Sequence, residues 1–202
     1  MEPIRILGIC TSPRVKRYTQ TMLEHSLEGA TSLDGASVAT ELYTVAGKKI
    51  DPCIGCRSCK KTGKCVQNDD MQELYEKIKS ADGIIFATPV YFYNINAQCK
   101  AIIDRTYAIQ PINGRKVGGI IVTAGSVGTS HAVSSLQMFF SVQGITPAGW
   151  IAAYAGVEKN DKAVQASFNL GARVVSLATE MKNATSNVFD VVNHFAFGTH
   201  TM

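Results

Sequence analysis

Short apolar segments alternate with helix-like segments along most of the 202 residues of this chain. A nearly continuous apolar strand is buried on both faces, and a strand that leads into a helix is usually followed by a parallel strand. The pattern predicts one α/β domain over residues 1–183 with a five-stranded parallel sheet covered by helices on both faces. The expected strands are 4–9, 36–44, 82–88, 116–124 and 145–154, and the expected helices are 19–28, 70–79, 97–107, 130–142 and 161–182.

The composition is that of an ordinary globular protein. Apolar residues make up 46% of the chain and charged residues 18%, which argues against disorder. The net charge of +4 comes without a long basic run, so we expect no nucleic-acid partner. No apolar run is long enough to cross a bilayer and no signal peptide is visible, so we expect a cytoplasmic protein without a membrane partner.

Four cysteines with the spacing C-x2-C-x2-C-x5-C occupy the irregular insert at residues 45–70. A cubane iron–sulfur cluster needs four thiolates around one inorganic core, and a compact run of this kind can supply them. Basic neighbours favour deprotonated thiols and offset the charge of a cluster. We therefore expect a [4Fe–4S] cluster on Cys53, Cys56, Cys59 and Cys65.

Other interpretations of the cysteine run stay open. Structural zinc usually uses two C-x2-C pairs with a longer spacer, disulfides suit small secreted chains, and the run could also bind nothing. The remaining two cysteines, Cys10 and Cys99, are expected to be small buried core residues.

A hydroxyl-rich and basic turn follows the first expected strand and opens the first helix. Backbone N–H groups and the helix dipole favour a phosphate at such a place, although the turn could also simply cap the helix. The dinucleotide and triphosphate glycine motifs are absent, so a phosphate monoester fits better. The candidate phosphate-binding residues are Ser12, Arg14, Lys16, Tyr18 and Thr19.

Two more loops are expected beside this turn, because ligands of doubly wound sheets bind beyond the carboxyl ends of the strands. With the strand order 2-1-3-4-5, the site lies between strands one and three. One loop carries aromatic residues that either contact a flat ring or belong to the core, and the other carries glycines. A phosphate beside a flat ring describes flavin mononucleotide (FMN). The candidate residues in the two loops are Pro89, Val90, Tyr91, Phe92, Asn94, Ala124, Gly125, Ser126 and Gly128.

Over roughly residues 1–155 the chain resembles the iron–sulfur flavoproteins, within the NADPH-dependent FMN reductase group of flavodoxin-like proteins. The resemblance rests on Ser12-Pro-Arg14, on the cysteine run, on residues 69–71, on Thr88-Pro-Val-Tyr-Phe92 and on the segment 100–105. It implies a flavodoxin-like fold, FMN in the three loops and a [4Fe–4S] cluster on the cysteines, with the two groups close across a subunit interface. Unlike many relatives, this chain has no Asn or Gly at 15–18.

The expected function is that of an FMN-dependent oxidoreductase. Electrons would pass from a ferredoxin-like donor through the cluster to FMN and on to oxygen, peroxide or a quinone. The alternatives are an NAD(P)H-dependent FMN or quinone reductase without a functional cluster, and a redox or metal sensor that uses the cysteine loop. We expect a homodimer or homotetramer, in which the apolar tail 184–202 packs on its own body or on a partner subunit.

Overall fold

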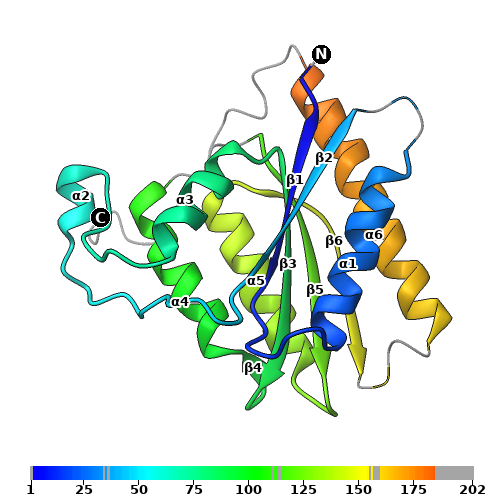
Figure 1. Ribbon diagram of the computed structural model, residues 1–202, viewed down its shortest axis with the longest axis horizontal. Coiled ribbons are helices and arrows are strands. Elements are labelled where there is room, and N and C mark those ends of the chain that lie inside the picture. The colour runs from blue at the N-terminus through cyan, green and yellow to red at the C-terminus, as the bar shows by residue number, and fades with distance from the viewer. Residues whose placement is uncertain are drawn as a thin grey trace.

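The computed structural model describes residues 2–184, apart from 34, 36, 111, 113, 114, 155 and 157–159. A parallel sheet lies between two layers of helices (Figure 1). One buried cluster joins one face of the sheet to α1 (Tyr18–Thr31) and α6 (Asp161–Asn183). The other cluster joins the opposite face to α3 (Met71–Ser80), α4 (Ala97–Arg105) and α5 (Thr129–Gln143).

The strand order confirms the prediction of a doubly wound sheet. The main strands are parallel in the order β2-β1-β3-β5-β6, which is the predicted order 2-1-3-4-5 when the short β4 is left out of the numbering. The strands are β1 (Ile4–Cys10), β2 (Val38–Thr44), β3 (Gly83–Tyr91), β4 (Asn94–Ile95), β5 (Val117–Ala124) and β6 (Thr146–Tyr154).

Alternation of side chains along β1 builds both halves of the core. Ile4, Ile6 and Cys10 face α1 and α6, whereas Leu7 and Ile9 face the helices on the other side. All five side chains are buried, as a central parallel strand requires. The prediction that Cys10 and Cys99 are core residues is confirmed, because both are fully buried.

Helices α1 and α6 pack with almost no space between their backbones. A Cβ atom placed on Gly29 would lie 1.9 Å from the carbonyl oxygen of Phe168, and one on Gly171 would lie 1.6 Å from that of Ser26. Neither contact leaves room for a side chain, so both positions require glycine. The close approach fixes the C-terminal half of α1 against α6.

The structure differs from the sequence-based expectation in three segments. β3 continues through Pro89 to Tyr91 instead of ending at residue 88, so Pro89 lies in a strand and not in a turn. The cysteine insert contains a short helix, α2 (Ser58–Thr62), and the helix expected to reach Tyr107 ends in a 3-10 turn, Thr106–Ile109.

The predicted tail lies outside the described residues from 185 onwards, so its packing and the predicted boundary at 183/184 stay predictions. Within the described part of the chain, no helix combines the length and the apolar character needed to cross a membrane.

Candidate functional site

Three loops meet at the carboxyl-terminal edge of the sheet, and Asn96 holds two of them together. The Asn96 side chain is 1% exposed. Its Oδ1 accepts hydrogen bonds from the Thr11 hydroxyl at 3.1 Å, the Thr88 hydroxyl at 3.2 Å and the Cys99 N–H at 3.1 Å, and its Nδ2 donates to the Thr11 carbonyl at 2.6 Å. One amide therefore caps α4 and fixes the chain after β1 against the end of β3.

The predicted phosphate turn leaves the start of α1 open to an anion. The Ser12 hydroxyl accepts from the Arg14 N–H at 3.2 Å and closes the turn. Arg17, the residue before the helix, offers no side-chain cap to its N–H groups. Arg14, Lys16 and Arg17 are exposed, and in the part of the chain that the structure describes none of them forms an ion pair. Unpaired N–H groups and cations at a helix N-terminus form an anion-binding environment.

Lys16, inside the phosphate turn, has a left-handed backbone. Its φ angle is 49°, which is unfavourable for a residue with a Cβ atom. The Lys16 N–H donates to the Gln20 side chain at 2.9 Å and so helps to hold the turn. The turn thus keeps a glycine-like shape without a glycine.

Thr19 ties the start of α1 to the end of β5. Its hydroxyl oxygen lies 2.6 Å from that of Thr123, and both side chains are buried. The hydroxyl of Thr19 therefore positions the helix, and its contact with a phosphate stays a prediction. Tyr18 lies beside it and is 38% exposed.

The glycines of the third loop have different roles. Gly128 has a φ of 92°, and a Cβ atom there would lie 2.6 Å from the Cα of Tyr93, so this glycine lets two loops touch. A Cβ atom on Gly125 would meet nothing within 4 Å. Ala124 is buried and Ser126 is exposed, so the open side of this loop lies at 125 and 126.

The aromatic residues form the tip of a tight hairpin between β3 and β4. Phe92 and Tyr93 both have positive φ angles, 43° and 69°, as a two-residue hairpin turn of this hand requires. Tyr91 is 40%, Phe92 96% and Tyr93 58% exposed, so the core interpretation of these three side chains is wrong.

The residues around the tip hold the hairpin in place. The Asn94 Oδ1 accepts from the Ser135 hydroxyl of α5 at 2.9 Å. Val90 pairs with Ile95 in β4, and Pro89 is buried opposite Thr123 of β5.

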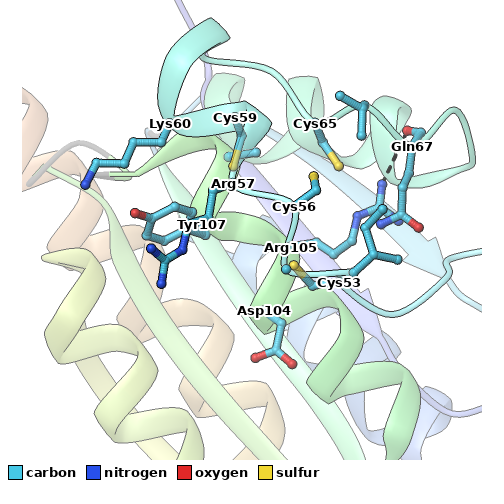
Figure 2. A pocket seen from close by; sticks show the side chains of 14 residues that line it. Cys53, Cys56, Arg57, Cys59, Lys60, Cys65, Gln67, Asp104, Arg105 and Tyr107 are labelled. Carbon is cyan, nitrogen blue, oxygen red and sulfur yellow. Dashed lines mark hydrogen bonds between the residues drawn. The ribbon is translucent and has the colours of Figure 1, made fainter. Parts of the chain in front are cut away.

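The four predicted cluster ligands line one cavity of about 500 Å³ beside α4 (Figure 2). All four are free thiols; Cys53 and Cys56 are exposed, whereas Cys59 and Cys65 are half-buried. Hydrogen bonds from Ser58, chiefly from its backbone N–H, lower the pKa of the Cys56 thiol. The exposed side chains of Arg57 and Lys60 also line this cavity, which we call the cysteine pocket.

The donor set suits a large inorganic core better than a single ion. Among the described residues, no group of three or more His, Cys, Asp or Glu side chains is placed to hold a metal ion. The thiols line the wall of a cavity instead of converging on one point, as the short Zn–S bonds of a zinc tetrahedron require. Four thiols around a space of this size fit a cluster, and its presence stays a prediction.

A buried ion pair closes the insert that carries the cysteines. The side chains of Arg105 and Asp69 are 0% and 2% exposed, with contacts of 2.5 Å from Nη1 to Oδ2 and 2.9 Å from Nη2 to Oδ1. Arg105 Nη1 also donates to the Asp51 carbonyl at 3.0 Å, and Asp69 accepts from the N–H groups of Asp51 and Met71. The pair therefore joins both ends of the insert to the end of α4.

The opposite charges of Arg105 and Asp69 stabilise the ionised form of the Asp69 carboxylate. Burial disfavours the ionised carboxylate, but hydrogen bonds from Arg105 and from backbone N–H groups keep the pKa of Asp69 below its usual value. Asp69 is also the side chain that caps α3, whereas Asp70 contributes no side-chain cap.

Sequence reasoning missed three residues of these sites: Asn96, Thr123 and Arg105. An Asn directly before a helical segment is a recognised capping signal, so Asn96 could have been found. Nothing local in the sequence shows that Thr123 meets Thr19 or that Arg105 is buried.

Comparison with known proteins shows the family of this chain. The family model of the NADPH-dependent FMN reductases matches residues 4–158. The chain is 32% identical over 176 residues to an iron–sulfur flavoprotein of Archaeoglobus fulgidus, covering 85% of this chain and 79% of the relative. It is 31% identical over 198 residues to an iron–sulfur flavoprotein of Methanocaldococcus jannaschii, covering 89% of this chain and 100% of the relative.

The likeness to solved structures concerns the fold. A flavodoxin from the domain Archaea superposes with a TM-score of 0.60 over 87% of this chain and 99% of the flavodoxin, at 17% identity. The predicted flavodoxin-like fold is thereby confirmed. The chain belongs to the NADPH-dependent FMN reductase family, among its iron–sulfur flavoproteins, and is an FMN-dependent oxidoreductase.

Proposed function

We propose that this flavoprotein couples a one-electron donor to a two-electron acceptor through a [4Fe–4S] cluster and FMN. Cys53, Cys56, Cys59 and Cys65 hold the cluster, which receives electrons from a ferredoxin-like protein. The observation that carries the proposal is that all four cysteines, as free thiols, line a single cavity. The reducing environment that keeps such thiols free is that of the cytoplasm, where we place the protein.

The loops at the sheet edge supply the FMN site. The N-terminus of α1 and the side chains of Arg14 and Lys16 bind the phosphate, with the hydroxyl of Ser12 shaping the turn. Tyr91, Phe92 and Tyr93 are already exposed at the neighbouring hairpin, where a flat ring can stack on them. The open side of Gly125 and Ser126 leaves space for the other side of the ring.

The cofactors carry the chemistry, and the chain binds and orients them. Two reduced one-electron donors would be oxidised for each acceptor, and bound FMN would supply the chemistry that joins single electrons into a two-electron reduction. Two electrons and two protons would reduce oxygen to hydrogen peroxide, a quinone to the hydroquinone, or hydrogen peroxide to two water molecules.

The placement of the two sites supports electron transfer between subunits. Asn96 caps the first turn of α4 beside the three loops at the sheet edge. Arg105 ends the same helix at the cysteine pocket. Nine residue steps of helix separate them by about 13 Å. Figure 1 shows α2 and β4 toward opposite ends of α4. We propose a homodimer or homotetramer in which the cysteine pocket of one subunit faces the three loops of the proposed FMN site of another.

A second candidate follows from the family model, whose description names NADPH-dependent FMN reduction. In that case NAD(P)H gives a hydride directly to FMN, and the cysteine pocket has a structural role.

The visible spectrum of anaerobically purified protein tests the first proposal. We expect flavin bands together with a broad cluster absorbance that dithionite bleaches, and about four iron and four sulfide per chain. Cys65→Ala should remove the iron and the broad absorbance while FMN is retained. The matched control is Cys99→Ala, which removes a thiol outside the pocket and should keep the iron. Protein with FMN and NADPH oxidation but without iron and sulfide would support the second candidate instead.

A further inference from the structure

The guanidinium of Arg105 has one donor that the protein leaves unpaired. Its Nη1 and Nη2 atoms bind Asp69 and the carbonyls of Asp51 and Gln67. The Nε–H is buried and has no hydrogen-bond partner among the described residues. Because the whole side chain is inaccessible, water does not compensate this donor. An unpaired donor on a buried charged group is rare, and it points to an acceptor that binds there.

Arg105 lies in the wall of the cysteine pocket. Figure 2 shows its side chain beside the thiols, with a dashed line to Gln67. Its charge also acts on a ligand cysteine. Burial opposes that charge, but the interactions with Asp69, with Tyr75 and, to a smaller extent, with Cys65 outweigh it and raise the pKa of Arg105 above its usual range. Arg105, which carries the unpaired donor, and Cys65 thus line one pocket.

We propose that Arg105 is the residue that tunes the redox group of the cysteine pocket, by donating its Nε–H to sulfur at Cys65 and by placing a permanent positive charge there. The acceptor is the Cys65 thiolate or a sulfide of the cluster it binds. The inference rests on the proposed function, because it needs a cluster on the four cysteines. Arg105 itself is not a ligand and is not a catalytic residue.

The electrostatic consequence has a definite sign. A cluster gains negative charge when it is reduced, so a hydrogen-bond donor and a cation beside its sulfur atoms stabilise the reduced state and raise the reduction potential. Asp69 holds the guanidinium in position and partly offsets its charge. Removing the donor should lower the potential, whereas neutralising Asp69 should not.

If Arg105 has only a structural role, a different result is expected. In that case Arg105 serves to join residues 51 and 69, and any change at the pair weakens the insert in the same way. Arg105 and Asp69 variants would then lower cluster content and thermal stability together. The potential of the cluster that remains would be unchanged. The two possibilities therefore differ in whether the potential of the remaining cluster shifts at all.

The test is a redox titration, followed by electron paramagnetic resonance, of anaerobic holoprotein carrying Arg105→Lys, Arg105→Gln or Asp69→Asn. Arg105→Lys keeps the charge but has no Nε–H, and we expect about a tenfold loss of electron affinity, which is about 59 mV for a one-electron couple. Arg105→Gln should lower the potential further. Asp69→Asn, the matched control that breaks the same ion pair, should leave the potential unchanged or raise it. Equal potentials in all four proteins, or a fall in Asp69→Asn, overturn the proposal.

The unmutated protein gives a second readout, and the variant assigns it to Arg105. With 15N-labelled arginine, pulsed resonance of the reduced cluster should show a coupled arginine nitrogen that disappears in Arg105→Lys. Absence of that coupling in a protein with full iron and sulfide overturns the tuning role alone. Absence of iron and sulfide instead refutes the proposed cluster, and with it the acceptor that this inference requires.

Discussion

The hydroxyl oxygens of Thr19 and Thr123 lie 2.6 Å apart although 104 positions separate the two residues in the chain. Thr19 stands in the first turn of α1, and Thr123 stands near the end of β5. The contact fixes the helix start, where the phosphate turn ends, against the strand that leads into the glycine loop. Two of the three loops of the proposed FMN site are therefore held by side chains of the rigid α/β body.

Arg14→Ala should weaken FMN far more than riboflavin. Arg14 is exposed, has no ion pair among the described residues and lies in the turn before α1, so its charge is available to the phosphate. A charge-assisted hydrogen bond contributes about 1.5–3 kcal/mol, or roughly 10- to 150-fold in affinity. Flavin fluorescence titration of both ligands measures the difference. Lys61→Ala, a charge change outside the turn, is the control, and equal losses for both flavins would remove Arg14 from the phosphate site.

Asn96→Ala should destabilise the protein by about 2–4 kcal/mol. It removes the cap of α4 and leaves the buried hydroxyls of Thr11 and Thr88 without their shared acceptor. Urea unfolding measures the loss, and FMN affinity should fall as well because the turn after β1 is no longer held. Asn96→Ser keeps a capping acceptor for the Cys99 N–H but loses the donor to the Thr11 carbonyl and to the Gln98 side chain, so its loss of stability should be smaller than that of Asn96→Ala. A loss of stability below about 1 kcal/mol in Asn96→Ala would contradict the role of this amide in holding the chain after β1 against the end of β3.

Lys16→Asn should stabilise the apoprotein by about 0.5–1 kcal/mol. Asn tolerates the left-handed region that Lys16 occupies at φ 49°, and the backbone donor to Gln20 is kept. The expected rise in the free energy of unfolding should come with weaker FMN binding, since one of the cations of the turn is lost. Lys64→Asn, which alters another exposed lysine, should change neither quantity to the same extent. A stability below that of the unmodified protein would show that the Lys16 backbone is not strained.

Asp69→Asn should cost about 3–5 kcal/mol at neutral pH, because it leaves the buried charge of Arg105 without its partner. The pKa of Asp69 is lowered in the folded state. Its contribution is therefore complete above the unfolded pKa, about 3.9, and is lost as the pH falls through the lower folded pKa. Unfolding measured from pH 7 to pH 2 should show the gap between the two proteins narrowing only at the acidic end. A gap that stays constant to pH 2 would mean that Asp69 does not titrate in this range.

Mixed oligomers test electron transfer between subunits. Cys65→Ala removes the cluster, and a subunit carrying both Arg14→Ala and Lys16→Ala lacks tightly bound FMN. Neither protein alone should reduce an acceptor with a ferredoxin-like donor. After subunit exchange, the mixture should regain activity, because the cluster of one chain faces the flavin of the other. A fully active monomer at low concentration would contradict this arrangement.

The succession of strands and helices could be read from the sequence because a buried strand is an apolar run followed by a helical period, whereas the strand order 2-1-3-4-5 was taken from known doubly wound folds. The positions of the strands and helices follow from local patterns of this kind, as in residues 117–124 of β5. The spacing of the four cysteines likewise predicts a cluster in the insert without reference to the fold. Even the exposure of the aromatic hairpin could be anticipated, since three consecutive aromatic residues cannot all face the core.

The tertiary structure decided how these parts are held together. Arg105 could be an exposed cation at a helix end, but its pairing with Asp69, 36 positions earlier, makes it a buried clamp. The local sequence around these two residues does not show the pairing. Asn96 looks like a helix cap in the sequence, but its bonds to Thr11 exist only because β1 and β3 are neighbours. Burial and long-range hydrogen bonds are properties of chain segments brought together, so they follow from the packing and not from the local pattern.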